Sequence, residues 1–396
     1  MDNSRFGIPS KEWREYSDAR PKLRLDEDGF HDDVFSSPER LRAAANAAKE
    51  RASRFMFAHD KLANQVTMSD FAIPTRDGSS IPMRKYQSTT SANGSAVVKV
   101  GNAVEEPVAE SLSAVPAFIY FHGGGMLFGS IDGEMHTCAS LARDLARGGS
   151  ATNSPGVIVL HVCYRHVPEF THPVQHQDAW DAFEWIFANA AILGIDVGNL
   201  VIGGISAGGS LAASVVFREL ERAQQTETAS DPRIHGQVLF IPWLIHRDAY
   251  PLDAFAAPEI ASLVACADSP TLPRPRYDMF TDLSRVADPR ADALMNIGLA
   301  LETTLKGMPR TAIVANGWDM LRDEAFLYAD KLERVGVPVK KHVFPGMPHA
   351  FRKYPDLPSS RRWDELMVES IRWCLTGKGK ADVVGEWIVE GPIQGT

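Results

Sequence analysis

One serine in this chain stands in a sequence setting that can make its hydroxyl reactive. Ser206 lies within GISAGG, after an apolar run at 200–202 and before a small-residue helical pattern that begins near Leu211. A strand, a very tight turn and a helix would hold this serine at the tip of the turn, the arrangement called a nucleophile elbow. Gly204 and Gly208 suit such a turn because side chains would collide where the strand doubles back into the helix. The free N–H groups at the start of the helix would favour negative charge that develops beside the serine.

A serine nucleophile needs a base within hydrogen-bond reach, and the base needs a third group to hold it. Asp319 follows an apolar strand predicted at 311–316, and His349 follows another at 339–344. The carboxyl ends of parallel strands meet at one edge of a sheet, so we expect both side chains beside the serine. We assign His349 as the base and Asp319 as the acid, with Asp323 as the second choice for the acid. The alternatives are that Asp319 only stabilises the start of a helix and that His349 is an ordinary loop histidine.

A glycine-rich segment offers the third requirement of ester hydrolysis, N–H donors for an oxyanion. HGGG at 122–125 follows a short apolar strand predicted at 116–121. The backbone of Gly123 and Gly124, with the N–H of Ala207, is predicted to supply these donors, because any side chain there would occupy the substrate's place. A plain glycine-rich turn after a strand is the alternative.

Strands and helices alternate along most of the chain, which predicts a mostly parallel sheet covered on both faces. The eight predicted strands lie at 66–74, 81–87, 116–121, 156–164, the apolar run at 200–202, 236–241, 311–316 and 339–344. Helices are predicted at 38–59, 135–147, 174–190, 322–335 and 363–375, and directly after the serine. Ser37 and Pro38 are a favourable start for the first helix.

The same pattern divides the chain into a core and a cap. We expect the core at 61–241 and 301–377, with a flexible insertion at 88–115 that has little periodicity. Residues 1–60 and 242–300, which the alternation does not need, are expected to form the cap over the carboxyl edge of the sheet. The remainder, 378–396, is expected to be a peripheral tail.

Composition excludes several classes of partner. The chain has 396 residues, 44% of them hydrophobic, and a formal net charge of −9 without a basic stripe. Nucleic acid and anionic membrane surfaces are therefore poor partners. No apolar run is long enough for a membrane span, and the charged first 30 residues do not resemble a secretory signal, so we expect a cytoplasmic protein.

Cysteines and histidines give no sign of a metal or disulfide framework. The four cysteines are far apart, which predicts buried free thiols. The spacing of His166, His172 and His176 invites a metal interpretation, but no further ligands accompany them, and ordinary histidines are the preferred interpretation.

Taken together, the motifs resemble those of the hormone-sensitive-lipase-like group of α/β hydrolases, the fold-3 carboxylesterases. The matching segments run in the group's order over 116–351: HGGG at 122–125, YR at 164–165 with PE at 168–169, GISAGG at 204–209, DMLRDE at 319–324 and HAF at 349–351. The resemblance implies an α/β-hydrolase fold with an eight-stranded sheet and a helical cap. It also implies a catalytic triad of Ser206, Asp319 and His349, and an oxyanion hole formed by Gly123, Gly124 and Ala207. Ile205 replaces a commonly acidic residue and HAF replaces HGF, and neither change removes a catalytic group.

The resulting hypothesis is a serine carboxylesterase that acts on small-molecule esters of small to medium acyl groups through an acyl-enzyme. It requires no cofactor and no metal, and a homodimer is left open. Two other uses of the same site are a ligand-binding receptor and a lyase or dehydratase. The pair of Ser206 and His349 disfavours the receptor, and analysis of products would separate a lyase from an esterase.

Overall fold

The computed structural model describes residues 1–20, 37–90, 114–147, 156–225, 233–376 and 386–393. Its α-helices are α1 (Lys11–Asp18), α2 (Pro38–His59), α3 (Met135–Arg147), α4 (Val174–Ala188), α5 (Ala190–Leu193), α6 (Ala207–Gln225), α7 (Ser262–Ala265), α8 (Arg274–Ser284), α9 (Glu302–Leu305), α10 (Arg322–Arg334) and α11 (Pro358–Thr376). Its strands are β1 (Val66–Pro74), β2 (Ser80–Ser88), β3 (Val115–Phe121), β4 (Ile158–Val162), β5 (Ile195–Ile205), β6 (Gly236–Phe240), β7 (Arg310–Trp318), β8 (Val339–Pro348) and β9 (Ile388–Val389). Most of the insertion predicted at 88–115 lies outside the described residues.

The described strands form one mostly parallel sheet in the order β1-β2-β4-β3-β5-β6-β7-β8-β9. The hairpin of β1 and β2 is antiparallel and joins the sheet antiparallel to β4. All other pairs, from β4–β3 to β8–β9, are parallel. The eight predicted strands are β1 to β8, and the ninth comes from the C-terminal tail, where Ile388 and Val389 pair with His342 and Val343 of β8. A strand of two residues carries too little pattern to be recognised from the sequence.

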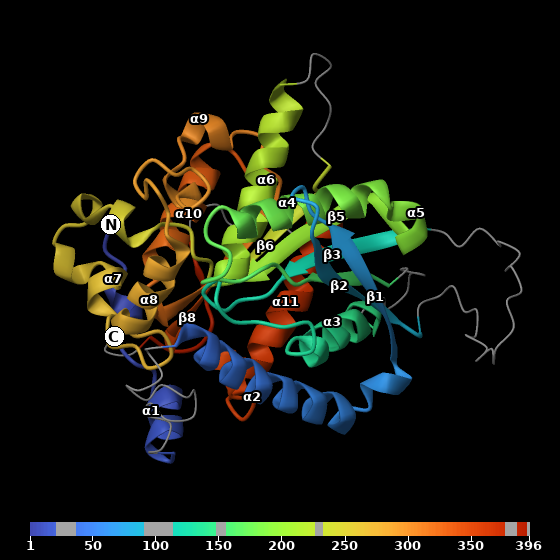
Figure 1. The fold of residues 1–396 in the computed structure, drawn as a ribbon. Coiled ribbons are helices and arrows are strands. Elements are labelled where there is room, and N and C mark those ends of the chain that lie inside the picture. The colour runs from blue at the N-terminus through green and yellow to red at the C-terminus, as the bar shows by residue number, and fades with distance from the viewer. Residues whose placement is uncertain (21–36, 91–113, 148–155, 226–232, 377–385, 394–396) are drawn as a thin grey trace, which may run out of the picture.

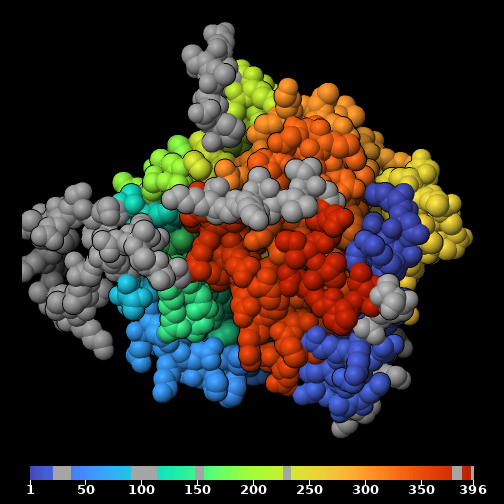
Figure 2. Space-filling model, turned by 180° about the vertical axis from the view of Figure 1, so that it is seen from behind, coloured from blue at the N-terminus to red at the C-terminus, as the bar shows by residue number. Residues whose placement is uncertain are grey.

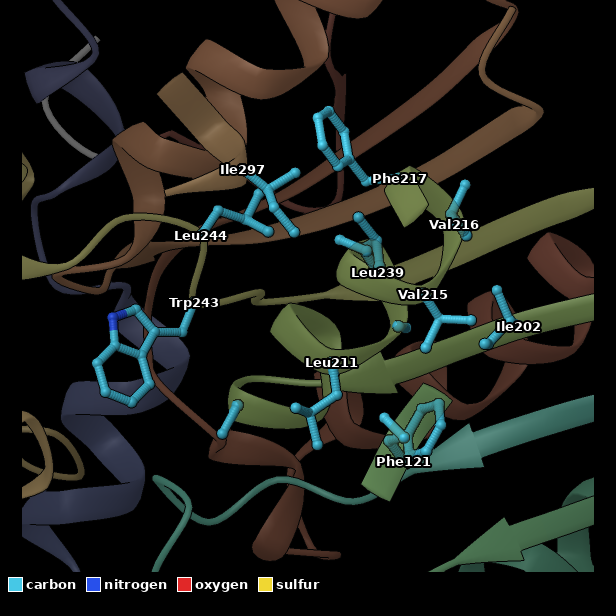
Figure 3. Close-up of a cluster of buried hydrophobic side chains, with 14 of the residues drawn as sticks. Phe121, Ile202, Leu211, Val215, Val216, Phe217, Leu239, Trp243, Leu244 and Ile297 are labelled. Carbon is cyan, nitrogen blue, oxygen red and sulfur yellow. The ribbon is translucent and has the colours of Figure 1, made fainter. Parts of the chain in front are cut away.

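Helices cover both faces of the sheet, as the alternation predicts (Figure 1). In β3, Ile119 and Phe121 belong to the core shared with α4, α6 and α10, whereas Phe118 and Tyr120 belong to the core shared with α3 and α11. This is the period-two alternation of a strand buried on both sides. Figure 3 shows the core on the side of α4, α6 and α10, in which side chains of β3, β5, β6 and α6 meet.

The N-terminal segment contains a helix that the sequence analysis left as irregular chain. Helix α1 begins after Ser10, whose hydroxyl accepts a hydrogen bond from the N–H of Trp13 at 3.0 Å. Only Trp13 of this charged helix is buried, and its eight residues are fewer than the window over which helical periodicity can be judged. The helix lies against the start of α11, where Glu12 accepts two hydrogen bonds from Ser359 (Figure 2).

The segments predicted as a cap lie over the loops that follow the parallel strands. Asn46 of α2 exchanges two hydrogen bonds of 2.9 Å with the backbone of Gly129. In the 242–300 segment, the hydroxyl groups of Ser262 and Ser269 donate to the backbone oxygens of Met320 and Trp318 at 2.8 Å. The division of the chain into core and cap as separate units stays a prediction.

Two further expectations concern cysteines and membrane spans. All four cysteines are free and buried, as predicted. Among the described residues, none of the helices combines the length and the apolar character that a membrane span requires.

Candidate active site

Ser206 occupies the sharp turn between β5 and α6 that GISAGG predicts. Its φ angle is +55°, a left-handed conformation that costs a serine roughly 1–3 kcal/mol. Two backbone hydrogen bonds hold the turn. The Ser206 N–H donates to the backbone oxygen of Phe240 at 2.9 Å, and the backbone oxygen of Ser206 accepts from the N–H of Trp243 at 3.1 Å. A Cβ on Gly204 would come within 2.3 Å of the carbonyl carbon of Gly208, and one on Gly208 within 2.1 Å of the Phe121 oxygen. Glycine is therefore required at both positions.

The structure brings Ser206, His349 and Asp319 into one chain of hydrogen bonds. Ser206 Oγ lies 3.0 Å from His349 Nε2, and His349 Nδ1 lies 2.7 Å from Asp319 Oδ2. A carboxylate only accepts, so Nδ1 carries the proton and Nε2 is left to accept from the serine hydroxyl. The other carboxylate oxygen of Asp319 accepts from the N–H of Leu321 at 3.0 Å. All three side chains are buried, from 0% exposure at Asp319 to 9% at Ser206.

Two neighbouring loops fix the positions of His349 and Asp319. The side chain of Asn316 donates to the oxygen of Pro348 at 2.8 Å, which ties the end of β7 to the end of β8. The hydroxyl of Thr271 donates to the backbone oxygen of His349. Neither Asn316 nor Thr271 was singled out from the sequence, because both act through backbone atoms of distant residues.

Asp323, the second choice for the acid, points elsewhere. Its carboxylate accepts from the N–H of Ser262 at 2.7 Å, from Arg322 Nε at 2.9 Å and from the side-chain amide of Asn3 at 3.1 Å. It is fully buried beside Arg322, and this pair fastens the first turn of α10 to the 242–300 segment and to the N-terminus. The geometry therefore favours Asp319 as the partner of the histidine.

Glu324 is a buried acid whose function the sequence did not reveal. Its Oε2 accepts from the backbone N–H groups of Leu244 and Ile245, the second at 2.6 Å, while Oε1 has no hydrogen-bond partner. Burial, opposed by these hydrogen bonds, raises the pKa of Glu324 well above its usual range. The side chain holds the chain that leaves β6 and passes behind Ser206.

The glycine-rich loop predicted to supply N–H groups for the oxyanion lies beside the serine. A Cβ on Gly123 would lie 2.9 Å from the Ile205 oxygen and 3.4 Å from Ser206 Cβ, so this loop runs directly beside the elbow. Gly124 has a φ of +136°, and a Cβ there would come within 2.3 Å of the Phe128 oxygen. Within the described part of the chain, the N–H groups of Gly123, Gly124 and Ala207 donate to no other residue.

His122 braces this loop from below. It is 0% exposed, its Nδ1 lies 3.0 Å from the Gly123 oxygen, and its ring stacks on Tyr164 at 4.4 Å between centroids. Burial lowers the pKa of His122 to about 3, so the ring is neutral at pH 7. The Tyr164 hydroxyl donates to the His122 oxygen at 2.9 Å, which adds a second brace.

The three histidines considered for a metal do not gather at one site. His172 Nε2 lies 2.8 Å from Asp292 Oδ2, and His176 packs edge-on against His172. His166 instead packs against the rings of His122 and Tyr164.

Aromatic side chains pack beside the glycine-rich loop at 122–125, which we call the oxyanion loop. Phe280 of α8 and Phe128 pack edge to face, with centroids 5.6 Å apart, and a Cβ on Gly125 would come within 2.2 Å of the Phe280 ring. Met126, Leu127 and Trp243 are at most 2% exposed and belong to the core.

Comparison with known proteins identifies the fold family of the chain. Residues 118–353 match the family model described as alpha/beta hydrolase fold. The chain is 29% identical to esterase LipI of Mycobacterium tuberculosis over 63% of this chain and 69% of that protein. It is 31% identical to an ethyl acetate hydrolase of Pseudomonas putida over 72% of this chain and 76% of the relative. The solved structure of vibralactone cyclase superimposes with a TM-score of 0.76 at 22% identity, covering 94% of this chain and 96% of the other.

Proposed function

Since this chain belongs to the alpha/beta hydrolase fold family, in its hormone-sensitive-lipase-like group, we propose that it is a serine carboxylesterase. The observation that carries the proposal is the hydrogen-bonded chain from Ser206 through His349 to Asp319. The relatives named as esterases and hydrolases support ester bonds as the target.

In the proposed reaction, Ser206 Oγ attacks the acyl carbonyl carbon while His349 Nε2 takes the hydroxyl proton. The carbonyl oxygen becomes an oxyanion that accepts hydrogen bonds from Gly123, Gly124 and Ala207. Each such donor is worth on the order of 10²–10³ in rate. The C–O bond to the alcohol then breaks, the alcohol leaves with the proton from His349, and an acyl-serine remains. A water molecule, deprotonated by the same imidazole, releases the acid and restores the serine.

Asp319 serves this cycle by orienting and stabilising the imidazole of His349. Its carboxylate keeps the proton on Nδ1 of His349, which leaves the Nε2 lone pair directed at the serine, and its charge stabilises the imidazolium that forms. Burial at 0% exposure strengthens both effects, because little water screens them.

For the substrate class we propose esters of small to medium acyl groups. Phe128 and Phe280 stand over the oxyanion loop, and their apolar rings offer the acyl group a contact of limited size. A series of aryl esters of increasing acyl length tests this point, with kcat/KM expected to fall once the acyl chain is longer than a medium one. The homodimer and the cytoplasmic location stay predictions.

The decisive experiment is covalent labelling by a fluorophosphonate. Labelling is expected in the unchanged protein and absent in Ser206→Ala, whose kcat for an aryl acetate should fall by about 10⁶-fold. Ser210→Ala is the matched control, since Ser210 is a buried serine one turn along α6 whose hydroxyl has no partner, and it should retain both properties.

The outcomes separate the other uses of the site. An unlabelled protein that returns the ester unchanged would overturn the proposal in favour of ligand binding. An elimination product without an acyl-enzyme would overturn it in favour of a lyase.

A further inference from the structure

A second cluster of reactive side chains includes His122, which begins the glycine-rich loop at 122–125. One ligand atom from each of His122, Cys163 and His166 lies within 4.8 Å of the other two. These residues come from the end of β3 and the loop after β4, which are adjacent parallel strands. The proposed esterase reaction uses neither Cys163 nor His166.

The nitrogen of His122 that faces no partner is free to bind a ligand. Its Nδ1 lies against the carbonyl oxygen of Gly123, and a carbonyl only accepts, so Nδ1 carries the proton. Nε2 therefore has a lone pair, and it is buried without a hydrogen-bond partner on a side chain that is 0% exposed. The Nε2 of His166 is also buried without a partner. Two orphaned imidazole nitrogens and a thiol in one place are unusual, because buried polar atoms normally find partners.

The cluster has a route to solvent. Cys163 and His166 both line a surface pocket of about 500 Å³. Arg42 and Glu169, which also line this pocket, bind each other through paired hydrogen bonds, one of them 2.7 Å long. Their charges therefore largely cancel at the mouth of the pocket.

We propose that His122, Cys163 and His166 form a binding site for a thiophilic divalent cation, Zn²⁺ in particular. Two imidazoles and one thiolate are ligands that Zn²⁺ prefers, and solvent in the pocket supplies the fourth position. On binding, the Cys163 thiol releases its proton to solvent as the Zn–S bond forms.

The spacing needs only a small adjustment. Ligand atoms around a tetrahedral Zn²⁺ lie about 3.4–3.8 Å apart. The 4.8 Å limit of the cluster therefore requires movements of roughly 1 Å, which side-chain rotation of the partly exposed His166 can provide.

Such a site would act on the oxyanion loop, and this part rests on the proposed function. His122 holds the carbonyl of Gly123, and the ring has no free space beside it, because a Cβ on Gly129 would come within 2.0 Å of its Cε1. A cation that binds the His122 imidazole and shifts the ring must therefore pull on the peptide that carries the proposed oxyanion donors. Zn²⁺ loading is therefore expected to lower kcat more than it changes KM.

Cobalt substitution tests the site directly. The full-length protein, freed of metal under reducing conditions, is titrated with Co²⁺ and then with Zn²⁺. The expected result is one Co²⁺ per chain with a thiolate-to-cobalt charge-transfer band, displaced by one equivalent of Zn²⁺. Cys163→Ser should abolish the band, and Cys163→Ser and His166→Leu should each weaken binding by at least about 100-fold, since even outer partners of a metal site are worth 10–100-fold.

Cys374→Ser is the matched control, because it removes a buried thiol on α11 outside the cluster. It should bind Co²⁺ as the unchanged protein does. Absence of the charge-transfer band in the unchanged protein, or equal affinity in the Cys163 and His166 variants, would overturn the proposal. The spectrum decides this even if the protein hydrolyses no ester, so the two proposals fail independently.

Discussion

At the scale of single residues, two aspartates four positions apart have separate tasks. Asp323 lies in the first turn of α10 and Asp319 lies three residues before that helix, so both are close to an end whose dipole favours a carboxylate. Asp319 faces His349 at 2.7 Å, whereas Asp323 joins Arg322, Ser262 and the N-terminus. The first is a partner in the proposed chemistry, and the second fastens segments to one another.

Replacing each aspartate by asparagine should distinguish these tasks. Asp319→Asn keeps the shape but allows the wrong imidazole tautomer, and kcat should fall by about 10⁴-fold, as in the corresponding change of a serine protease. Asp323→Asn breaks a buried ion pair and should lower the free energy of unfolding by about 3 kcal/mol, while kcat changes less than about tenfold. Steady-state kinetics and thermal unfolding of both variants provide the measurements. A fully active Asp319→Asn, or an inactive but folded Asp323→Asn, would reverse the assignment.

At the scale of elements, the N-terminal segment packs on the two strands that carry Asp319 and His349. A Cβ on Gly317, near the end of β7, would come within 2.0 Å of the Phe6 oxygen. A Cβ on Gly346, near the end of β8, would come within 2.1 Å of the Ile8 oxygen and 2.3 Å of the Ser10 nitrogen. Glycine at both positions lets the N-terminal chain lie against the backbone just before each proposed catalytic residue.

Alanine at Gly346 should therefore affect catalysis as well as stability. Gly346 has a φ of +63°, and the added methyl group must push the N-terminal chain away. Because His349 is three residues further on, we expect kcat to fall by about 10–100-fold, the cost of a misplacement of about 1 Å. The test is kcat with an aryl ester together with thermal unfolding.

Gly336 offers the control for backbone strain alone. It has a φ of +81° with nothing within 4 Å of an added Cβ, so Gly336→Ala should cost about 1 kcal/mol of stability and leave kcat unchanged. Equal kcat in the two alanine variants would show that the contact with the N-terminal segment does not position His349.

At the scale of the whole molecule, paired buried carboxylates make stability depend on pH. Burial alone would raise the pKa of Glu219, but hydrogen bonds from Arg222 and Arg233 outweigh it and lower the pKa to about 2. In Glu134, burial is likewise outweighed, by the charge of Lys49 and nearby imidazoles, and its pKa is also about 2. These carboxylates bind protons more weakly in the folded state, so their contribution is complete above pH 4.5 and is lost as the pH falls toward 2.

Glu219→Gln should therefore destabilise the protein only where the carboxylate is charged. Near pH 7 we expect the free energy of unfolding to fall by roughly 2 kcal/mol, and the difference should vanish as the pH approaches 2. Melting temperatures measured between pH 2 and pH 7 check this. Glu221→Gln on the exposed face of the same helix should show little difference at any pH. A Glu219→Gln deficit that persists at low pH would point to lost packing instead of lost charge.

Local pattern alone determined the strands β1 to β8, the longer helices and the elbow at Ser206. Apolar alternation and glycine between a strand and a helix act over a few residues, so both patterns can be recognised directly in the sequence. The same patterns indicated Ser206, Asp319 and His349 together with their chain order. They could not reveal α1 or β9, because a short polar helix and a two-residue strand are stabilised by residues far away in the chain.

Only the tertiary structure decided which side chains face one another. Asp319 and Asp323 are equivalent to any rule about helix starts, and the hydrogen bond to His349 separates them. The contact of the N-terminal chain with Gly346 joins segments that are far apart in the sequence. The approach of His122 to Cys163 and His166 likewise joins the ends of two separate strands. Such contacts depend on the packing of whole elements, whose energies are sums over many residues, so no local sequence pattern records them.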